Sequence, residues 1–419
     1  MLPIAGRFVF ILIFFWLWQP VGLAQSAAIQ VLPIESPCME GGESNLFVDD
    51  LGTVWLSWVE FVNDSVDALR VARLEGDTWT NSREIARGDN WFVNWADFPS
   101  LAVFSGTNGQ VLAAHWLQKS AAGTFDYDIR MRLSQDGGAT WDPPFTLNQD
   151  GIAAEHGFVS LAPTSDGQLR AVWLDGRHTK MDEEDADHAG HHGGAMTLRS
   201  ALITPSGVLK EDIEIDSRVC DCCQTDLAYT SDGPIVVYRN RSEEEIRDIY
   251  VARQENGKWS EPFVLHPDKW LIAGCPVNGP AISTIGNNAA VGWFTGAGGK
   301  NKVQVSFSKT GGATFGKARR IDSGNPLGRV DIDWLSEQRA VVTWLEKTAE
   351  GARIQLRTIH RNGRKGAAHL LMETSAERAS GFPIIARDSN GLLLSVTEVG
   401  AMKKTRVCTY RIILPLERN

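Results

Sequence analysis

The sequence predicts an all-β protein, a single β-propeller whose blades each contain four strands. Two observations predict this fold. Short apolar strands alternate with turns that contain Gly, Asn or Asp along nearly the whole chain. The same strand–turn–strand unit also recurs at intervals of about 50 to 65 residues, which is the spacing of propeller blades.

The first residues are typical of an export signal. Residues 8–18 form an apolar run behind an arginine, followed by a small-residue cleavage site that ends at Ala24. We therefore expect a signal peptide over residues 1–24 and one mature domain over residues 25–419. A membrane anchor is the alternative, but Pro20 interrupts the short apolar core. The protein is predicted to be exported, periplasmic or secreted, with no membrane span after signal cleavage.

Seven units begin with a pair of strands joined by a tight turn. Each pair would form the two inner strands of a blade, and the second strand ends in aromatic or apolar residues followed by a polar one. The seven pairs cover residues 45–60, 99–118, 159–175, 225–240, 280–295, 330–346 and 383–398.

Six of these units continue with two further strands, and the seventh has room for only one more. The outer pairs cover residues 69–85, 129–147, 198–215, 249–265, 303–321 and 354–371. The segment 29–34 can supply the strand missing from the last unit, closing the ring and removing an exposed edge. We predict seven blades, with six blades and an extra segment as the alternative.

One turn carries a recognisable motif, Ser-x-Asp-x-Gly-x-Thr-Trp, and a second turn repeats it with a Thr in place of the Asp. The chain here resembles the sialidase-like (BNR/Asp-box) propeller superfamily, over nearly all of residues 38–415. The motif marks the fold rather than an activity, because its polar residues tie the hairpin and its aromatic packs between strands. The residues concerned are Ser134, Asp136, Gly138, Thr140 and Trp141, then Ser308, Gly312, Thr314 and Phe315.

Composition limits the partners. The formal net charge of −10 disfavours nucleic acid and offers no basic patch to an anionic membrane. Six cysteines in an exported chain can form up to three disulfides, whose pairing the sequence does not give. The remaining partners are a small molecule, a glycan, a metal ion or another exported protein.

Function is predicted on one face of the ring. The segments that precede innermost strands and follow second strands share the face opposite the Asp-box turns, which we call the lead-in face. The resemblance implies that an active site would lie there, around the axis. The segments that precede the innermost strands are 38–44, 95–99, 155–159, 220–226, 275–280, 328–331 and 380–383.

A cysteine-rich site is predicted on the lead-in face. Cys220, Cys222 and Cys223 lie within four residues, and the strand register brings Cys275 and His156 toward them, with Cys38 nearby. Thiolates and imidazole are ligands for copper or zinc. Disulfides are the alternative, and one pair can be oxidised while the other thiols bind a metal.

The longest loop, residues 178–196, lies beside this site. It is acidic and carries His188, His191 and His192. A loop of this length is either functional or a mobile acidic flap. As a functional loop it would be a lid that gathers metal with its histidines.

The sequence does not decide whether the protein is an enzyme. If the protein is an enzyme, the resemblance implies a glycoside hydrolase with three arginines, a Tyr–Glu pair and an Asp, but the Arg-Ile-Pro motif of sialidases is absent. Candidate catalytic residues are Asp97, Glu155, Asp226, Tyr238, Arg239 and Asp331. Candidate ligand-binding residues are Trp95, Asp175, Arg177, Arg239, Arg241, Trp270 and Asn278.

We therefore predict an exported propeller that binds a ligand or a soft metal ion, copper or zinc, rather than a true sialidase. An exo-sialidase or related glycoside hydrolase is one alternative. A non-catalytic propeller that binds another protein is the other.

Overall fold

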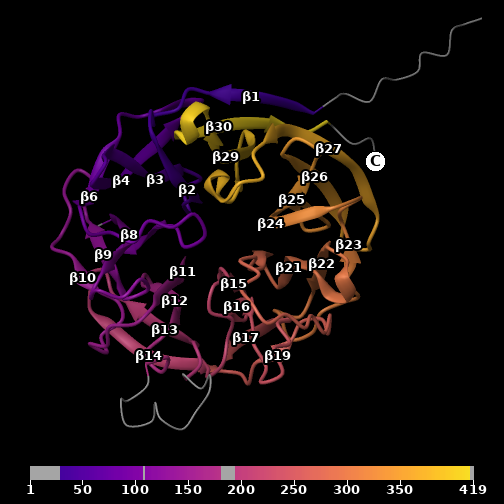
Figure 1. Cartoon of the computed structure of the whole chain (residues 1–419), viewed down its shortest axis with the longest axis horizontal. Coiled ribbons are helices and arrows are strands. Elements are labelled where there is room, and N and C mark those ends of the chain that lie inside the picture. Colours follow the sequence, from indigo (N-terminus) through magenta and orange to yellow (C-terminus); the bar gives the residue numbers. More distant parts are fainter. Residues whose placement is uncertain (1–28, 107–108, 181–193, 416–419) are drawn as a thin grey trace, which may run out of the picture.

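A computed structural model describes residues 29–106, 109–180 and 194–415. Seven antiparallel blades surround a central axis, and consecutive blades are neighbours in the ring (Figure 1). This confirms the all-β propeller with seven blades and excludes the six-blade alternative. Within the described residues, helix is confined to three short 3-10 turns.

The blades are numbered from the first complete one, each written from the axis outward. Blade 1 consists of β2 (Gly41–Val48), β3 (Val54–Asn63), β4 (Val66–Glu75) and β5 (Thr78–Trp79) with β6 (Arg83–Gly88). Blade 2 consists of β7 (Leu101–Gly106), β8 (Gly109–Lys119), β9 (Tyr127–Ser134) and β10 (Phe145–Thr146). Blade 3 consists of β11 (His156–Pro163), β12 (Leu169–Asp175), β13 (Thr197–Ile203) and β14 (Leu209–Asp216). Blades 4 and 5 are β15 (Asp226–Thr230), β16 (Gly233–Arg239), β17 (Ile249–Glu255), β18 (Lys258–Trp259) with β19 (Phe263–Val264); and β20 (Ala281–Ile285), β21 (Asn288–Thr295), β22 (Lys302–Ser308), β23 (Arg319–Arg320). Blades 6 and 7 are β24 (Pro326–Ser336), β25 (Arg339–Lys347), β26 (Ala352–His360), β27 (Lys365–Thr374); and β28 (Ile384–Asp388), β29 (Gly391–Val399), β30 (Thr405–Ile413), β1 (Gln30–Ile34).

The second strand of each blade supplies most of the core. Every residue of β12 is buried, because a second strand is covered by the neighbouring blades on both faces. Trp58, Trp173, Trp293 and Trp344 occupy second strands and are at most 1% exposed. Full burial of a large apolar side chain stabilises a fold by about 1.5–3 kcal/mol, so these tryptophans hold adjacent blades together.

The N-terminal strand closes the ring as predicted. β1 pairs with β30 antiparallel, from Gln30 opposite Ile413 to Ile34 opposite Thr409 (Figure 1). Blade 7 therefore takes its outer strand from one end of the chain and its inner three from the other. The pairing covers an edge of β30 that would otherwise carry unpaired N–H and C=O groups.

The Asp-box turns lie between third and fourth strands and are tied by their own side chains. Ser134 Oγ accepts a hydrogen bond from Gly138 N at 2.8 Å, and Asp136 accepts hydrogen bonds from Thr140 N at 2.8 Å and Thr140 Oγ1 at 2.6 Å. In the second box Ser308 Oγ accepts from Gly312 N at 3.0 Å. Both glycines have positive φ, which no bulky residue adopts cheaply. Trp141 is half-buried against the core of the neighbouring blade.

Three innermost strands carry β-bulges near the lead-in face. The pairing shifts between Gly42 and Asn45 in β2, between Gly157 and Ser160 in β11, and between Gly328 and Asp331 in β24. Glu43, Phe158 and Arg329 lie in these bulges with φ between 51° and 54°. A bulge adds one residue to a strand and so re-aims the side chains that follow.

None of the helices in the described residues is long and apolar enough to span a membrane. The predicted signal peptide and its cleavage site lie outside the described residues.

Candidate functional site

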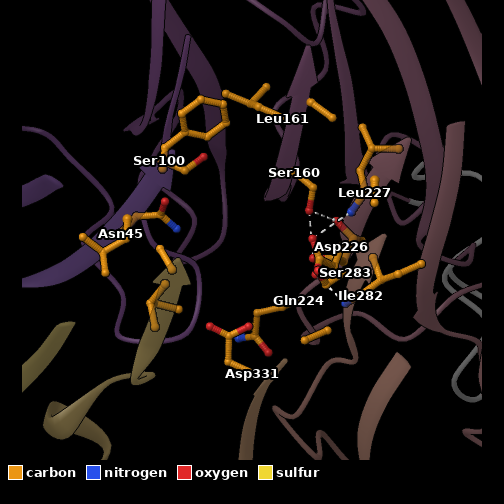
Figure 2. Close-up of a pocket in the computed structure, with 18 of the residues that line it drawn as sticks. Asn45, Ser100, Ser160, Leu161, Gln224, Asp226, Leu227, Ile282, Ser283 and Asp331 are labelled. Carbon is orange, nitrogen blue, oxygen red and sulfur yellow. Dashed lines mark hydrogen bonds between the residues drawn. The ribbon is translucent and has the colours of Figure 1, made fainter. Parts of the chain in front are cut away.

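A cavity of about 610 Å³ lies on the axis, lined by the innermost strands of the ring. Figure 2 shows the labelled side chains around it, among them Ser160, Gln224 and Asp331. Gln224 binds two different blades: its Nε2 donates to Ala96 O at 2.5 Å, and its Oε1 accepts from Gly279 N at 3.0 Å. The segment that carries the cysteines is therefore anchored at the channel on both sides.

Three of the predicted catalytic carboxylates link neighbouring blades. Asp97 accepts from Phe158 N at 2.6 Å, Asp226 from Ile282 N at 2.7 Å, and Asp331 from Ile385 N at 2.7 Å. Burial raises their pKa values to about 7, about 7 and about 8, respectively. Because each holds a backbone N–H of the next blade, their geometry describes an inter-blade contact rather than a free acid or base.

Four thiols gather beside the channel. The Sγ atoms of Cys220, Cys222 and Cys223 all lie within 4.8 Å of one another, and those of Cys220 and Cys223 are 3.3 Å apart. Cys275, in the loop before blade 5, lies near Cys222, and the neighbouring Cys222 thiol lowers the pKa of Cys275. All four are free cysteines in this structure. Blades 4 and 5 thus bring together the four thiols that the sequence grouped.

The backbone places this cluster on the lead-in face. Cys220 N donates to Arg239 O at 2.9 Å at the end of β16, and Val219 pairs with Asn240. Cys220 and Cys223 are at most 1% exposed, Cys222 is half-buried and Cys275 is exposed. The cluster therefore has a buried side formed by one loop and an open side formed by another.

An arginine that the sequence reading missed lies against the cluster. Arg247 Nη1 donates to Cys220 Sγ at 3.2 Å, and Arg247 Nη2 donates to Glu245 at 2.8 Å. Burial alone would raise the pKa of Cys220, but the neighbouring thiols and the Arg247 guanidinium bring that pKa well below its ordinary value. Burial raises the pKa of Cys223 to about 12. The Arg247 guanidinium thus favours a thiolate at Cys220.

A second arginine, Arg241, lies in the outer part of the same group. Its guanidinium donates to Asp221 at 3.1 Å and to Glu245 at 2.6 Å. Burial raises the pKa of Asp221 despite these cations. Arg241 therefore shares its carboxylate partners with Arg247, and its described hydrogen bonds go to those carboxylates rather than to sulfur.

His156 belongs to a different group from the cysteines, which corrects its predicted place among them. Its Nδ1 lies 3.1 Å from Tyr127 O and its Nε2 lies 3.0 Å from Asp150 Oδ2, with Asp175 at 3.7 Å. Burial opposes charge on the ring, but the two carboxylates raise the pKa of His156. Arg177 donates twice to Asp175 at 2.7 Å and lies 3.2 Å from Asp150, so one guanidinium faces both carboxylate partners of the histidine.

Glu155 and Asp97 share one phenol. Tyr127 Oη lies 3.0 Å from Glu155 and 3.1 Å from Asp97. Burial raises the pKa of Glu155 to about 8. One hydroxyl proton cannot serve two ionised carboxylates, so one of the two carboxyls holds a proton here. Tyr127 is fully buried, and no motif in the sequence singles it out.

Tyr238 is not exposed on the lead-in face. It is fully buried and its hydroxyl donates to Asp216 at 2.6 Å. Cys38 is likewise away from the cluster, since it packs with Ile34 and Val407 where blades 7 and 1 meet. The predicted neighbourhood of Cys38 with the other cysteines was wrong.

No known sequence family matches the chain, and no curated protein does. Solved structures match it in fold. An ulvan lyase, described as a new family of polysaccharide lyase, has a TM-score of 0.54 at 10% identity, with 90% of this chain and 94% of that chain covered. A protein of unknown function from Dyadobacter fermentans has a TM-score of 0.52 at 11% identity, with 92% and 99% covered. A sialidase from Streptococcus pneumoniae has a TM-score of 0.45 at 9% identity, with 90% and 68% covered.

The fold is a seven-bladed β-propeller, and it resembles that of the ulvan lyase. In this propeller, the candidate arginines do not form one group. Arg239 gives its donors to the carbonyl oxygens of Asn278, Arg247 and Phe294 and lies over the Trp270 ring at 4.9 Å. Arg239 and Trp270 are both buried, which corrects the prediction that Arg239 is catalytic and that both residues bind a ligand.

Asn278 and Trp95 also contact their own protein. Asn278 Oδ1 accepts from Arg329 N at 2.7 Å and its Nδ2 donates to Pro276 O at 3.1 Å. Trp95 stacks on Phe382, with ring centroids 5.7 Å apart, and the Arg329 guanidinium lies 4.8 Å from its ring. These contacts join segments at the lead-in ends of blades 2, 5, 6 and 7.

The predicted metal-gathering loop is only partly described. His188, His191 and His192 lie outside the described residues. Met196, at the end of that loop, is buried and packs in the core between blades 3 and 4.

Proposed function

We propose that the protein binds one soft metal ion, copper(I) or zinc, through Cys220, Cys222, Cys223 and Cys275. The observation that carries the proposal is the convergence of four thiols from two loops, three of them with Sγ atoms within 4.8 Å of one another. Thiolates at about 2.3 Å from a tetrahedral zinc ion lie about 3.8 Å apart, and the Sγ atoms of Cys220, Cys222 and Cys223 lie close to this spacing. Soft sulfur ligands select copper(I) and zinc over hard cations.

The surrounding charges support an anionic sulfur cluster. Arg247 contacts Cys220 directly, and Arg239 lies close enough to Cys223 to favour its ionised form. Buried thiolates need such compensation, because an unpaired buried charge is costly. Since both described nitrogens of His156 have other partners, the donor set we propose is all sulfur.

Metal analysis of the purified full-length protein tests the proposal. We expect one copper or zinc ion per chain, lost in Cys220→Ala and Cys223→Ala. Cys408→Ala is the matched control, because Cys408 is a buried free cysteine in β30 of blade 7. A chain without metal, whose Cys220, Cys222, Cys223 and Cys275 are all in disulfides, would contradict the proposal. We further propose that the protein acts after export, which fractionation of the producing cells would test.

A glycan ligand on the same face is the second candidate. The support is Glu155, a half-buried carboxyl whose pKa of about 8 suits a general acid, together with the fold shared with an ulvan lyase. A screen of sialosides and acidic polysaccharides, repeated with Glu155→Gln, tests it. Turnover that Glu155→Gln removes would favour this candidate, and an absence of turnover would leave metal binding as the function.

A further inference from the structure

We propose that Cys275 is the exchangeable ligand of the metal site, through which the ion is taken up and released. This inference rests on the proposed metal binding and adds a division of labour among the four thiols. Cys220, Cys222 and Cys223 would hold the ion. Cys275 would dissociate from the ion and be replaced by an incoming thiolate.

Exposure separates the four thiols into two kinds. Cys220 is fully buried, Cys223 is 1% exposed and Cys222 is half-buried, whereas Cys275 is exposed. A ligand that competes for a bound ion must approach from solvent, and Cys275 is the thiol on that side. Reactivity of protein thiols likewise depends on access as well as on ionisation.

Both loops that supply the thiols are held by hydrogen bonds. The loop of Cys220 is fixed by the hydrogen bond from Cys220 N to Arg239 O and by the two hydrogen bonds of Gln224. The loop of Cys275 is anchored before the thiol, where Trp270 N donates to Asp248 at 3.0 Å, and after it, where Arg239 Nη2 donates to Asn278 O at 2.7 Å. Gly274, next to Cys275, has open space where a side chain would project. The geometry therefore leaves room for an incoming ligand beside Cys275.

The exchange step balances without oxidation. An incoming thiolate sulfur forms a bond to the metal, and the bond between the metal and Cys275 Sγ breaks. The released Cys275 thiolate then takes a proton from water, and the metal keeps its charge. Cys220, Cys222 and Cys223 continue to hold the ion, with Arg247 beside Cys220.

Alkylation of the metal-loaded protein with iodoacetamide tests this assignment. We expect Cys275 to react at least about tenfold faster than Cys220, Cys222 and Cys223, because it is exposed. Native mass spectrometry should still find one metal ion per chain after Cys275 alone is alkylated. Transfer of the ion from this alkylated protein to a small dithiol chelator should then be about tenfold faster, since one ligand is already lost.

A variant gives an independent readout. Cys275→Ser should bind one metal ion about 10- to 100-fold more weakly than the unchanged protein, whereas Cys220→Ser should not retain it. Unchanged affinity in Cys275→Ser, faster alkylation of Cys222, or joint alkylation of all four thiols with loss of metal would overturn the inference. An unchanged protein that binds no metal would instead overturn the proposed function itself, so the two failures are distinguishable.

Discussion

At the scale of single residues, Arg247 and Arg241 form a natural pair for comparison. Both hold Glu245 and Asp221, but Arg247 also donates to Cys220 Sγ. Arg247→Gln should lower the affinity for the metal about tenfold, because the anionic cluster loses its nearest cation. Competition with a chromophoric chelator measures the affinity.

Arg241→Gln is the matched control, and we expect a change of less than about threefold, because its ion pairs are partly solvated and do not reach sulfur. Equal losses in both variants would show that the shared carboxylates matter and the contact with sulfur does not.

Some residues of the candidate site could be placed from the sequence, and others could not. The cysteine cluster could be predicted, because three of its members are neighbours in the chain and the strand register supplied the fourth. His156 could not be placed. A bulge in β11 follows His156 directly, and the His156 ring contacts Asp150, which lies before that strand. Arg239 was predicted at the functional face from its position after a strand, yet its donors all go to buried carbonyl oxygens.

At the scale of strands and turns, the Asp box has a measurable role. Ser134→Ala should lower the free energy of unfolding by about 1–3 kcal/mol, because Gly138 N loses its acceptor inside the protein. Urea denaturation followed by tryptophan fluorescence measures the change. Ser206→Ala is the control, since Ser206 is an exposed turn residue. A loss in Ser134→Ala no larger than in this control would show that the box hydrogen bond is dispensable.

The carboxylates that join adjacent blades predict a pH dependence. An aspartate ordinarily has a pKa near 3.8, and burial raises those of Asp97, Asp226 and Asp331 to about 7, about 7 and about 8. Between the ordinary pKa of an aspartate and these raised pKa values, the three carboxyl groups stay protonated in the folded chain but are ionised in the unfolded chain. The stabilisation is complete below the unfolded pKa and is lost as the pH rises through the folded pKa. The free energy of unfolding should therefore fall from about pH 5 to about pH 8.

Asp331→Asn isolates one of these groups. The amide keeps the size of the side chain but carries no titratable proton, so the decrease between about pH 5 and about pH 8 should be smaller. Urea midpoints at the two pH values measure the slope. Asp136→Asn is the control, because hydrogen bonds from Thr140 lower the pKa of Asp136 to about 2, outside this range. A slope unchanged in Asp331→Asn would contradict the assignment.

At the scale of the whole molecule, the ring depends on β1. Removal of residues 29–34 would leave one edge of β30 unpaired over five residues. We expect a lower melting temperature and concentration-dependent association, because free strand edges pair with other chains. Calorimetry and size-exclusion chromatography measure the two effects. Gln30→Ala, which keeps the strand, should behave like the unchanged protein, and a monomeric deletion variant of unchanged stability would contradict the role of β1.

The architecture could be predicted from the sequence at this scale because blades 1 to 6 are each built from consecutive strands of the chain. The repeat spacing and the apolar pattern therefore determine them, and blade 7 adds only β1 from the other end of the chain. Side-chain partners are different, because they depend on bulges and on contacts between blades. Tyr127, for example, meets Glu155 and Asp97 from two other segments, and the strand pattern carries no information about such a meeting.

The order of synthesis determines when the pairing of β1 with β30 can form. β1 is made first and its partner β30 last, so the first strand waits for almost the entire chain before it can pair. A contact between residues so far apart in sequence forms slowly, because a very long loop must close. Blades 1 to 6 can each assemble from neighbouring segments, but the ring becomes continuous only when the two ends meet. Until then, β1 has no partner strand and blade 7 lacks its outer strand.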